Sequence, residues 1–162
     1  MKHLFLAAAP VALISLALHA NATGLPLGQA LVAAQAAVSA CKASGYNVTV
    51  TIMDPDLSPR IVLRADGAPA GTVQIAYRKA YTVIKMGMSS GDFSKTVPAP
   101  PSQGQPQGPP GPVNGDPNLI TWAGGLPITV AGAQLGSMSV SGAPTGDKDE
   151  TCVKAGLAKI AT

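Results

Sequence analysis

Aromatic and charged side chains are both scarce in this 162-residue chain, at 4% and 12% of its residues. The formal net charge is only +3 and is spread thinly, so the chain has no basic stripe that could follow a phosphate backbone or an anionic membrane. We therefore expect neither nucleic acid nor a membrane surface as a partner. The shortage of aromatic side chains also argues against an aromatic platform for sugars.

Histidine is equally scarce, because the chain has only His3 and His19. Both lie in an N-terminal segment that we expect to be removed, which would leave the mature chain without histidine. That absence excludes Ser-His-Asp and Cys-His hydrolysis and zinc sites built on imidazole. No metal site is predicted, and no catalytic residue is assigned.

The N-terminal segment has the features of a secretory signal peptide. Lys2 and His3 precede an apolar run from Leu4 to Leu18, and small residues suited to cleavage follow at Ala20 and Ala22. A retained membrane anchor is the alternative, but the run is shorter than the ~20 residues that a bilayer requires. We expect a signal peptide over 1–22, a single domain over 23–162, and a periplasmic or secreted product.

The chain has two cysteines, Cys41 and Cys152. An oxidising compartment makes an intramolecular disulfide between them the natural expectation. Each cysteine falls on the inner face of a predicted terminal helix, so the bridge would require those two helices to lie side by side. Two unpaired buried thiols are the alternative.

Three segments have the periodicity of helices. The first runs from Leu27 to Ser44. The second begins at Thr72, which we expect to cap it, and is ended by Gly87 and Gly91. The third runs from Asp147 through Ile160. The inner face expected for the first helix comprises Leu27, Leu31, Ala34, Val38 and Cys41. The second helix has two faces. One comprises Thr72, Ile75, Ala76, Lys79, Ala80 and Val83, and the other comprises Tyr77, Tyr81, Ile84 and Met88.

Alternating apolar residues predict the strands. A half-buried strand over 47–53 pairs with 60–64 as a hairpin, a short strand covers 119–122, and 126–130 pairs with 133–141 across Ala131-Gly132. Between them, residues 94–118 are rich in proline and glycine and predict an extended loop. This order predicts an α+β fold, an antiparallel sheet of about five strands packed by N-terminal, middle and C-terminal helices.

Four separated motifs resemble the GlcG/HbpS-like haem-binding family, which is also found as a domain in PduO-type cobalamin-related proteins. The motifs are RADGA at 64–68, KAYT at 79–82, GGLPI at 124–128 and VSGA at 140–143. The resemblance covers 25–160. It implies a domain with three-layer character that forms homo-oligomers and, in several members, binds haem or a related tetrapyrrole.

The resemblance also implies a ligand site. Arg64 or Lys79 would pair with a propionate, and the glycines would let a flat ligand approach the backbone. The alternative is structural, with a buried Arg64–Asp66 or Lys79–Asp66 ion pair and glycines required by turns. The predicted ligand-binding residues are Arg64, Asp66, Gly67, Ala68, Lys79, Thr82, Gly124 and Gly125.

Some members of that family ligate iron through a histidine near the start of the first helix, where this chain has Leu25-Pro26-Leu27. Tyrosine and methionine are the other ligand types available. If haem binds, the predicted axial candidates are Tyr81, Tyr77, Met86 and Met88, each with ordinary packing as the alternative.

Three functions follow as hypotheses. The first is an exported haem or tetrapyrrole-binding protein that captures, stores or senses its ligand. The second is an enzyme or carrier for a small organic acid such as a glycolate-related metabolite, in which Lys79 or Arg64 holds the carboxylate and Asp66 or Asp54 acts as base. The third is an oligomeric, non-catalytic protein that binds a partner through its proline-rich loop.

Overall fold

The computed structural model describes residues 24–97 and 112–160. The predicted signal peptide and much of the predicted loop, residues 98–111, lie outside the described residues. The helices are α1 (Leu27–Ala43), α2 (Thr72–Met86), α3 (Ser90–Thr96) and α4 (Gly146–Leu157). The strands are β1 (Thr49–Met53), β2 (Pro59–Arg64), β3 (Gly125–Val130) and β4 (Ala133–Ser141).

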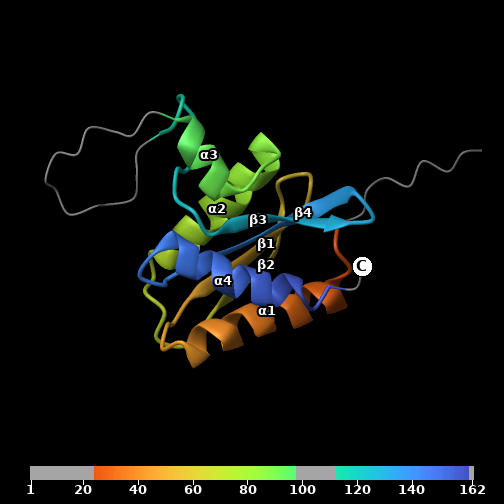
Figure 1. Cartoon of the computed structure of the whole chain (residues 1–162), viewed down its shortest axis with the longest axis vertical. Coiled ribbons are helices and arrows are strands. Elements are labelled where there is room, and N and C mark those ends of the chain that lie inside the picture. The colour runs from red at the N-terminus through yellow and green to blue at the C-terminus, as the bar shows by residue number, and fades with distance from the viewer. Residues whose placement is uncertain (1–23, 98–111, 161–162) are drawn as a thin grey trace, which may run out of the picture.

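The four strands form one antiparallel sheet in the order β2-β1-β4-β3. Helices α1 and α4 lie side by side on one face of this sheet, and α2 covers the opposite face with α3 beyond it (Figure 1). The predicted α+β class is therefore confirmed, as are both predicted hairpins. None of the described helices is long and apolar enough to cross a membrane.

The predicted short strand over 119–122 is not a strand, so the sheet has four strands rather than about five. Side chains of α2 take the backbone groups that a neighbouring strand would otherwise pair. The Ile120 N–H donates to Thr82 Oγ1 at 3.0 Å, and the Leu119 carbonyl accepts from the Arg78 guanidinium. Both residues are buried all the same.

Strand β1 is buried on both faces, whereas the sequence predicted a half-buried strand. Val50 and Ile52 face the core below α1 and α4. On the other face, Thr49 Oγ1 lies 2.7 Å from Thr72 Oγ1 at the start of α2. A central strand with helices on both faces needs no solvent-facing side, which explains the difference.

The predicted inner face of α1 is confirmed at Ala34 and Cys41 and is wrong at Leu27 and Leu31. The alanines Ala30, Ala33 and Ala37 are buried, whereas Leu27 and Leu31 are 54% and 42% exposed. Helices α1 and α4 approach so closely that a Cβ on Gly156 would lie 2.7 Å from the Ala33 carbonyl oxygen. Only small side chains fit between them, so the alanine face packs inward.

Helix α2 begins at Thr72 itself, one residue earlier than predicted, and is ended by Gly87, the first of the two predicted end glycines. Gly71 is its N-cap, and the Thr72 hydroxyl instead contacts Pro69 and Thr49. Gly87 closes the helix with a positive φ of 67°. Of the two faces identified in the sequence, the one that contains Thr72 and Lys79 is buried throughout.

Helix α3 was not predicted, and its second half lies in the segment interpreted as loop. The Ser89 hydroxyl caps it by accepting from the Asp92 N–H at 2.9 Å. Phe93 anchors it in a small apolar cluster with Val113 and Leu119. A seven-residue helix with one apolar anchor has too little periodicity to be recognised in the sequence.

The predicted disulfide is present between α1 and α4. Cys41 and Cys152 are bonded with a Cα–Cα distance of 5.5 Å, and their sequence separation is 111 residues. The bond joins helices that already pack through small side chains. It therefore restricts the unfolded chain over most of its length.

The double variant Cys41→Ala/Cys152→Ala should lower the free energy of unfolding by about 3 kcal/mol, because the unfolded chain regains the entropy of a long loop. Urea denaturation of a protein that comprises residues 23–162 measures this. Reductant should destabilise the unmodified protein to a similar extent and leave the variant unchanged. Equal stability of variant and unmodified protein would contradict the assignment.

Candidate functional site

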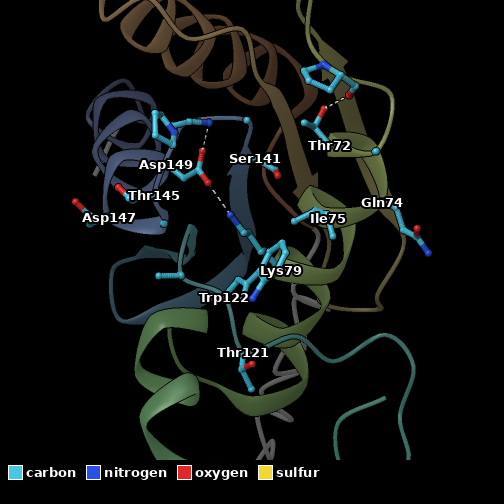
Figure 2. Close-up of a pocket in the computed structure, with 17 residues that line it drawn as sticks. Thr72, Gln74, Ile75, Lys79, Thr121, Trp122, Ser141, Thr145, Asp147 and Asp149 are labelled. Atoms are coloured by element: carbon cyan, nitrogen blue, oxygen red, sulfur yellow. Dashed lines mark hydrogen bonds and ion pairs between the residues drawn. The ribbon is translucent and has the colours of Figure 1, made fainter. Parts of the chain in front are cut away.

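One pocket lies beside the N-terminal half of α2, and its volume is about 800 Å³. Its other walls are the segment that precedes β3 and the loop that joins β4 to α4 (Figure 2). The described residues that line it are Pro69, Gly71, Thr72, Gln74, Ile75, Lys79, Thr121, Trp122, Ala123, Ser141, Gly142, Ala143, Pro144, Thr145, Gly146, Asp147 and Asp149.

A buried ion pair lies at the inner end of the pocket. Lys79 on α2 and Asp149 on α4 are only 2% and 3% exposed, and Lys79 Nζ lies 2.7 Å from Asp149 Oδ2. Lys79 Nζ also donates to the Val140 carbonyl at 3.0 Å. Asp149 Oδ1 accepts from the Ala143 N–H at 2.9 Å (Figure 2). The pair therefore joins α2, the end of β4, the following loop and α4.

Burial acts on both charges of this pair. It lowers the pKa of Lys79, and the Asp149 carboxylate opposes that shift. It raises the pKa of Asp149, against the pull of the Lys79 ammonium. Both directions indicate that desolvation costs free energy which the attraction between the two groups offsets only in part.

Gly124 and Gly125 make room for this pair and for α2. Gly124 has a φ of +123°, and a Cβ there would lie 2.6 Å from Lys79 Nζ. A Cβ on Gly125 would lie 2.9 Å from the Lys79 carbonyl oxygen. Packing against Lys79 therefore explains the presence of glycine at both positions, neither of which lines the pocket.

The predicted residues of the RADGA turn do not line the pocket. Arg64 Nε donates to the Ala68 carbonyl at 2.9 Å, and Gly67 has the positive φ of a tight turn. Asp66 is exposed, and Lys79 pairs with Asp149 rather than with Asp66. The turn leads into Pro69 and the start of α2, so it supports the pocket rim from outside.

The remaining predicted residues lie on the other sides of α2. The Thr82 hydroxyl donates to the Arg78 carbonyl at 2.8 Å and accepts from Ile120. Tyr81 donates to Asp116 at 3.0 Å, and its ring lies 6.3 Å from that of Tyr77. Met86 and Met88 pack against the Phe93 cluster. Among the predicted ligand residues and axial candidates, Lys79 is the one that lines the described pocket.

Sequence reasoning missed Trp122 and Asp149 as site residues. Trp122 fell in a segment interpreted as a strand, although a lone tryptophan beside a Gly-Gly pair was a usable signal. Asp149 lies in the first turn of the predicted third helix, where an acidic side chain is expected for its interaction with the helix dipole alone. Its partner is 70 residues away, and no local pattern shows such a pairing.

The chain belongs to a family whose model is described as "Haem degrading protein HbpS-like" and matches residues 25–158. A crystal structure of a double mutant of HbpS from Streptomyces reticuli is 33% identical, with a TM-score of 0.76, and the match covers 96% of this chain and 99% of that one. A second HbpS crystal structure is 32% identical, with a TM-score of 0.74 and coverage of 86% and 92%.

A crystal structure described as a PduOC:haem complex shares the fold, with a TM-score of 0.69 at 21% identity over 85% of this chain and 96% of that one. Among curated proteins, no match is found. These likenesses confirm the family resemblance and the fold drawn from the sequence.

The pocket fits a haem-sized ligand in volume, since sites for small molecules and cofactors span about 300 to 1,000 Å³. Its described lining does not fit haem iron. Nitrogen, sulfur or phenolate ligands come from histidine, cysteine, methionine or tyrosine, and none of these residue types lines the described pocket. The described lining therefore offers none of the usual ligands to haem iron.

Lys79→Met should lower the free energy of unfolding by about 3 to 5 kcal/mol, because it leaves the Asp149 carboxylate buried without its partner. Lys79→Met/Asp149→Asn removes both charges and keeps an acceptor for the Ala143 N–H, so it should recover half of that loss or more. Urea denaturation of the three proteins checks this. A double variant as unstable as the single one would show that the pair itself is strongly stabilising.

Proposed function

We propose that this protein is an exported tetrapyrrole-binding protein that holds haem or a related macrocycle in the pocket beside α2. Membership of the HbpS-like family supports a haem-related ligand. The observation that carries the proposal is the pocket itself, with a volume of about 800 Å³ and a lining that combines apolar surface with a few polar groups.

The proposed contacts follow from the lining residues. The half-buried Trp122 offers an indole ring to the face of a flat macrocycle, and Ile75 adds aliphatic surface from α2. The Lys79 ammonium at the inner end would attract a propionate, with Asp149 moderating its charge. Gln74 is exposed at the rim, where its amide would hydrogen-bond a second carboxylate.

Export is part of the proposal. The signal-peptide pattern over 1–22 supports it, and the Cys41–Cys152 disulfide is typical of an oxidising compartment. Self-association is proposed from the family resemblance, and the exposed side chains of Leu27, Leu31 and Val32 on α1 are suited to a contact between copies.

The organic-acid hypothesis has less support from the geometry. Lys79 could hold a small carboxylate, but the predicted base Asp66 is exposed outside the pocket. The carboxylate beside Lys79 is Asp149, and both of its oxygens accept hydrogen bonds from the protein. A pocket of this volume also exceeds the needs of a two-carbon acid.

Titration of the purified mature protein with haemin should shift the Soret band and saturate at a fixed stoichiometry. Trp122→Ala should weaken binding about tenfold, which corresponds to ~1.4 kcal/mol. Tyr81→Phe, on the other side of α2, is the matched control and should bind normally. A stable spectrum over hours supports binding without turnover.

Absence of a saturable Soret shift at micromolar protein would refute the proposed function. An affinity that depends on Tyr81 and not on Trp122 would move the site to the other flank of α2. Progressive bleaching of the bound haem in the presence of a reductant would replace binding with degradation as the function.

A further inference from the structure

We infer that the pocket recognises the ring and carboxylates of a tetrapyrrole and not its iron, so that a metal-free porphyrin is bound as tightly as haem. This inference rests on the proposed function and specifies its ligand class. Two observations support the inference. One is the set of side chains that line the pocket, and the other is the position of the tyrosines, methionines and cysteines outside it.

The nitrogen and carboxylate donors at the inner end of the pocket are already engaged. Lys79 Nζ donates to Asp149 and to the Val140 carbonyl, and an ammonium has no lone pair for a metal. Asp149 accepts from Lys79 with one oxygen and from the Ala143 N–H with the other. Neither group is available to iron without breaking the buried pair.

The hydroxyl groups along the pocket walls do not supply an iron ligand in place of Lys79 or Asp149. Thr72 Oγ1 donates to the Pro69 carbonyl at 2.6 Å and lies against Thr49 Oγ1. Thr121, Ser141 and Thr145 carry neutral hydroxyls, which are not among the usual axial ligands of haem iron. Asp147 is exposed at the rim, and interaction with Thr145 lowers its pKa.

Residues of the types that ligate haem iron lie outside the lining of the described pocket. Met53 and Met138 are fully buried in the sheet, and Cys41 and Cys152 are bonded to each other. Tyr81 is hydrogen-bonded to Asp116 on the far flank of α2. Bringing it into the pocket would require α2 to rotate and lose the contacts of its other buried residues, which are Thr72, Ile75, Ala76, Arg78, Lys79, Ala80, Thr82 and Val83.

The sequence outside the described core adds no such ligand to the mature domain. Residues 98–111 consist of alanine, glutamine, glycine, proline and serine, and residues 161–162 are Ala-Thr. What the pocket offers instead is surface for a ring, from Trp122, Ile75, Pro69, Ala143 and Pro144, together with the Lys79 ammonium for a propionate. The free energy of binding should therefore come from parts that haem and protoporphyrin IX share.

The test compares haemin with metal-free protoporphyrin IX on the full-length mature protein. Trp122 is the chain's one tryptophan, so quenching of its fluorescence reports both ligands with one signal. The two dissociation constants should agree within about threefold, a difference below ~1 kcal/mol. The ferric complex should be high-spin, because no nitrogen or sulfur side chain binds the iron.

The outcomes separate this inference from the proposed function. Haemin that binds more than about tenfold tighter than protoporphyrin IX, or a low-spin ferric spectrum, would overturn the inference while leaving haem binding intact. If haemin binds more tightly and its ferric complex is high-spin, loss of the difference in affinity in Tyr77→Phe or Tyr81→Phe would identify a phenolate supplied from α2 or from a second copy. If neither ligand quenches Trp122, both the inference and the proposed function fail.

Discussion

The rest of the structure around the pocket depends on one buried ion pair, Lys79–Asp149. It joins the helix on one face of the sheet to the start of a helix on the other face, and it draws the Val140 carbonyl and the Ala143 N–H into the same network. A buried pair of this kind contributes little net stability, because desolvation consumes most of the Coulombic gain. We interpret its role as fixing position, since it sets where the walls of the pocket stand.

The two faces of the sheet are packed by different means. On the side of α1 and α4, alanines and Gly156 allow very close approach, and a disulfide reinforces it. On the side of α2, hydroxyls of β4 donate to helix carbonyls, with Ser139 bonded to Ala76 at 2.6 Å and Ser137 to Ala80 at 2.9 Å. Directional hydrogen bonds fix the rotation of α2 more closely than apolar contacts would, which keeps Lys79 toward the pocket and Tyr81 away from it.

The sequence predicted those parts of the fold that depend on the periodicity of one segment, on turn residues or on the number of cysteines. The buried face of α2, the two hairpins and the Cys41–Cys152 bridge all followed from periodicity, turn residues and cysteine count. The exposure of Leu27 and Leu31 on α1 did not, because alanine and leucine are both suited to an inner face and only the distance to α4 decides between them. The strand expected at 119–122 does not form, and the reason is again a tertiary contact. The side chains of Arg78 and Thr82 form hydrogen bonds with the backbone of Leu119 and Ile120.

The site was harder to predict than the fold. Lys79 and Gly124 were identified from motifs, but the motif could not show that the glycine makes room for the lysine or that the lysine's partner is Asp149. Trp122 lines the pocket because the segment before β3 lies beside α2, and no pattern in the sequence shows that arrangement. Pairings between residues far apart in sequence are set by the tertiary fold, and the chemistry of this pocket consists largely of such pairings.

A crystal structure of this protein with haemin or protoporphyrin IX bound would test this account most directly. The account predicts a macrocycle in contact with Trp122, with a propionate directed toward Lys79 and the Lys79–Asp149 pair intact behind it. A macrocycle bound on the opposite flank of α2, with Tyr77 or Tyr81 ligating its iron and the pocket beside Trp122 left open, would contradict it.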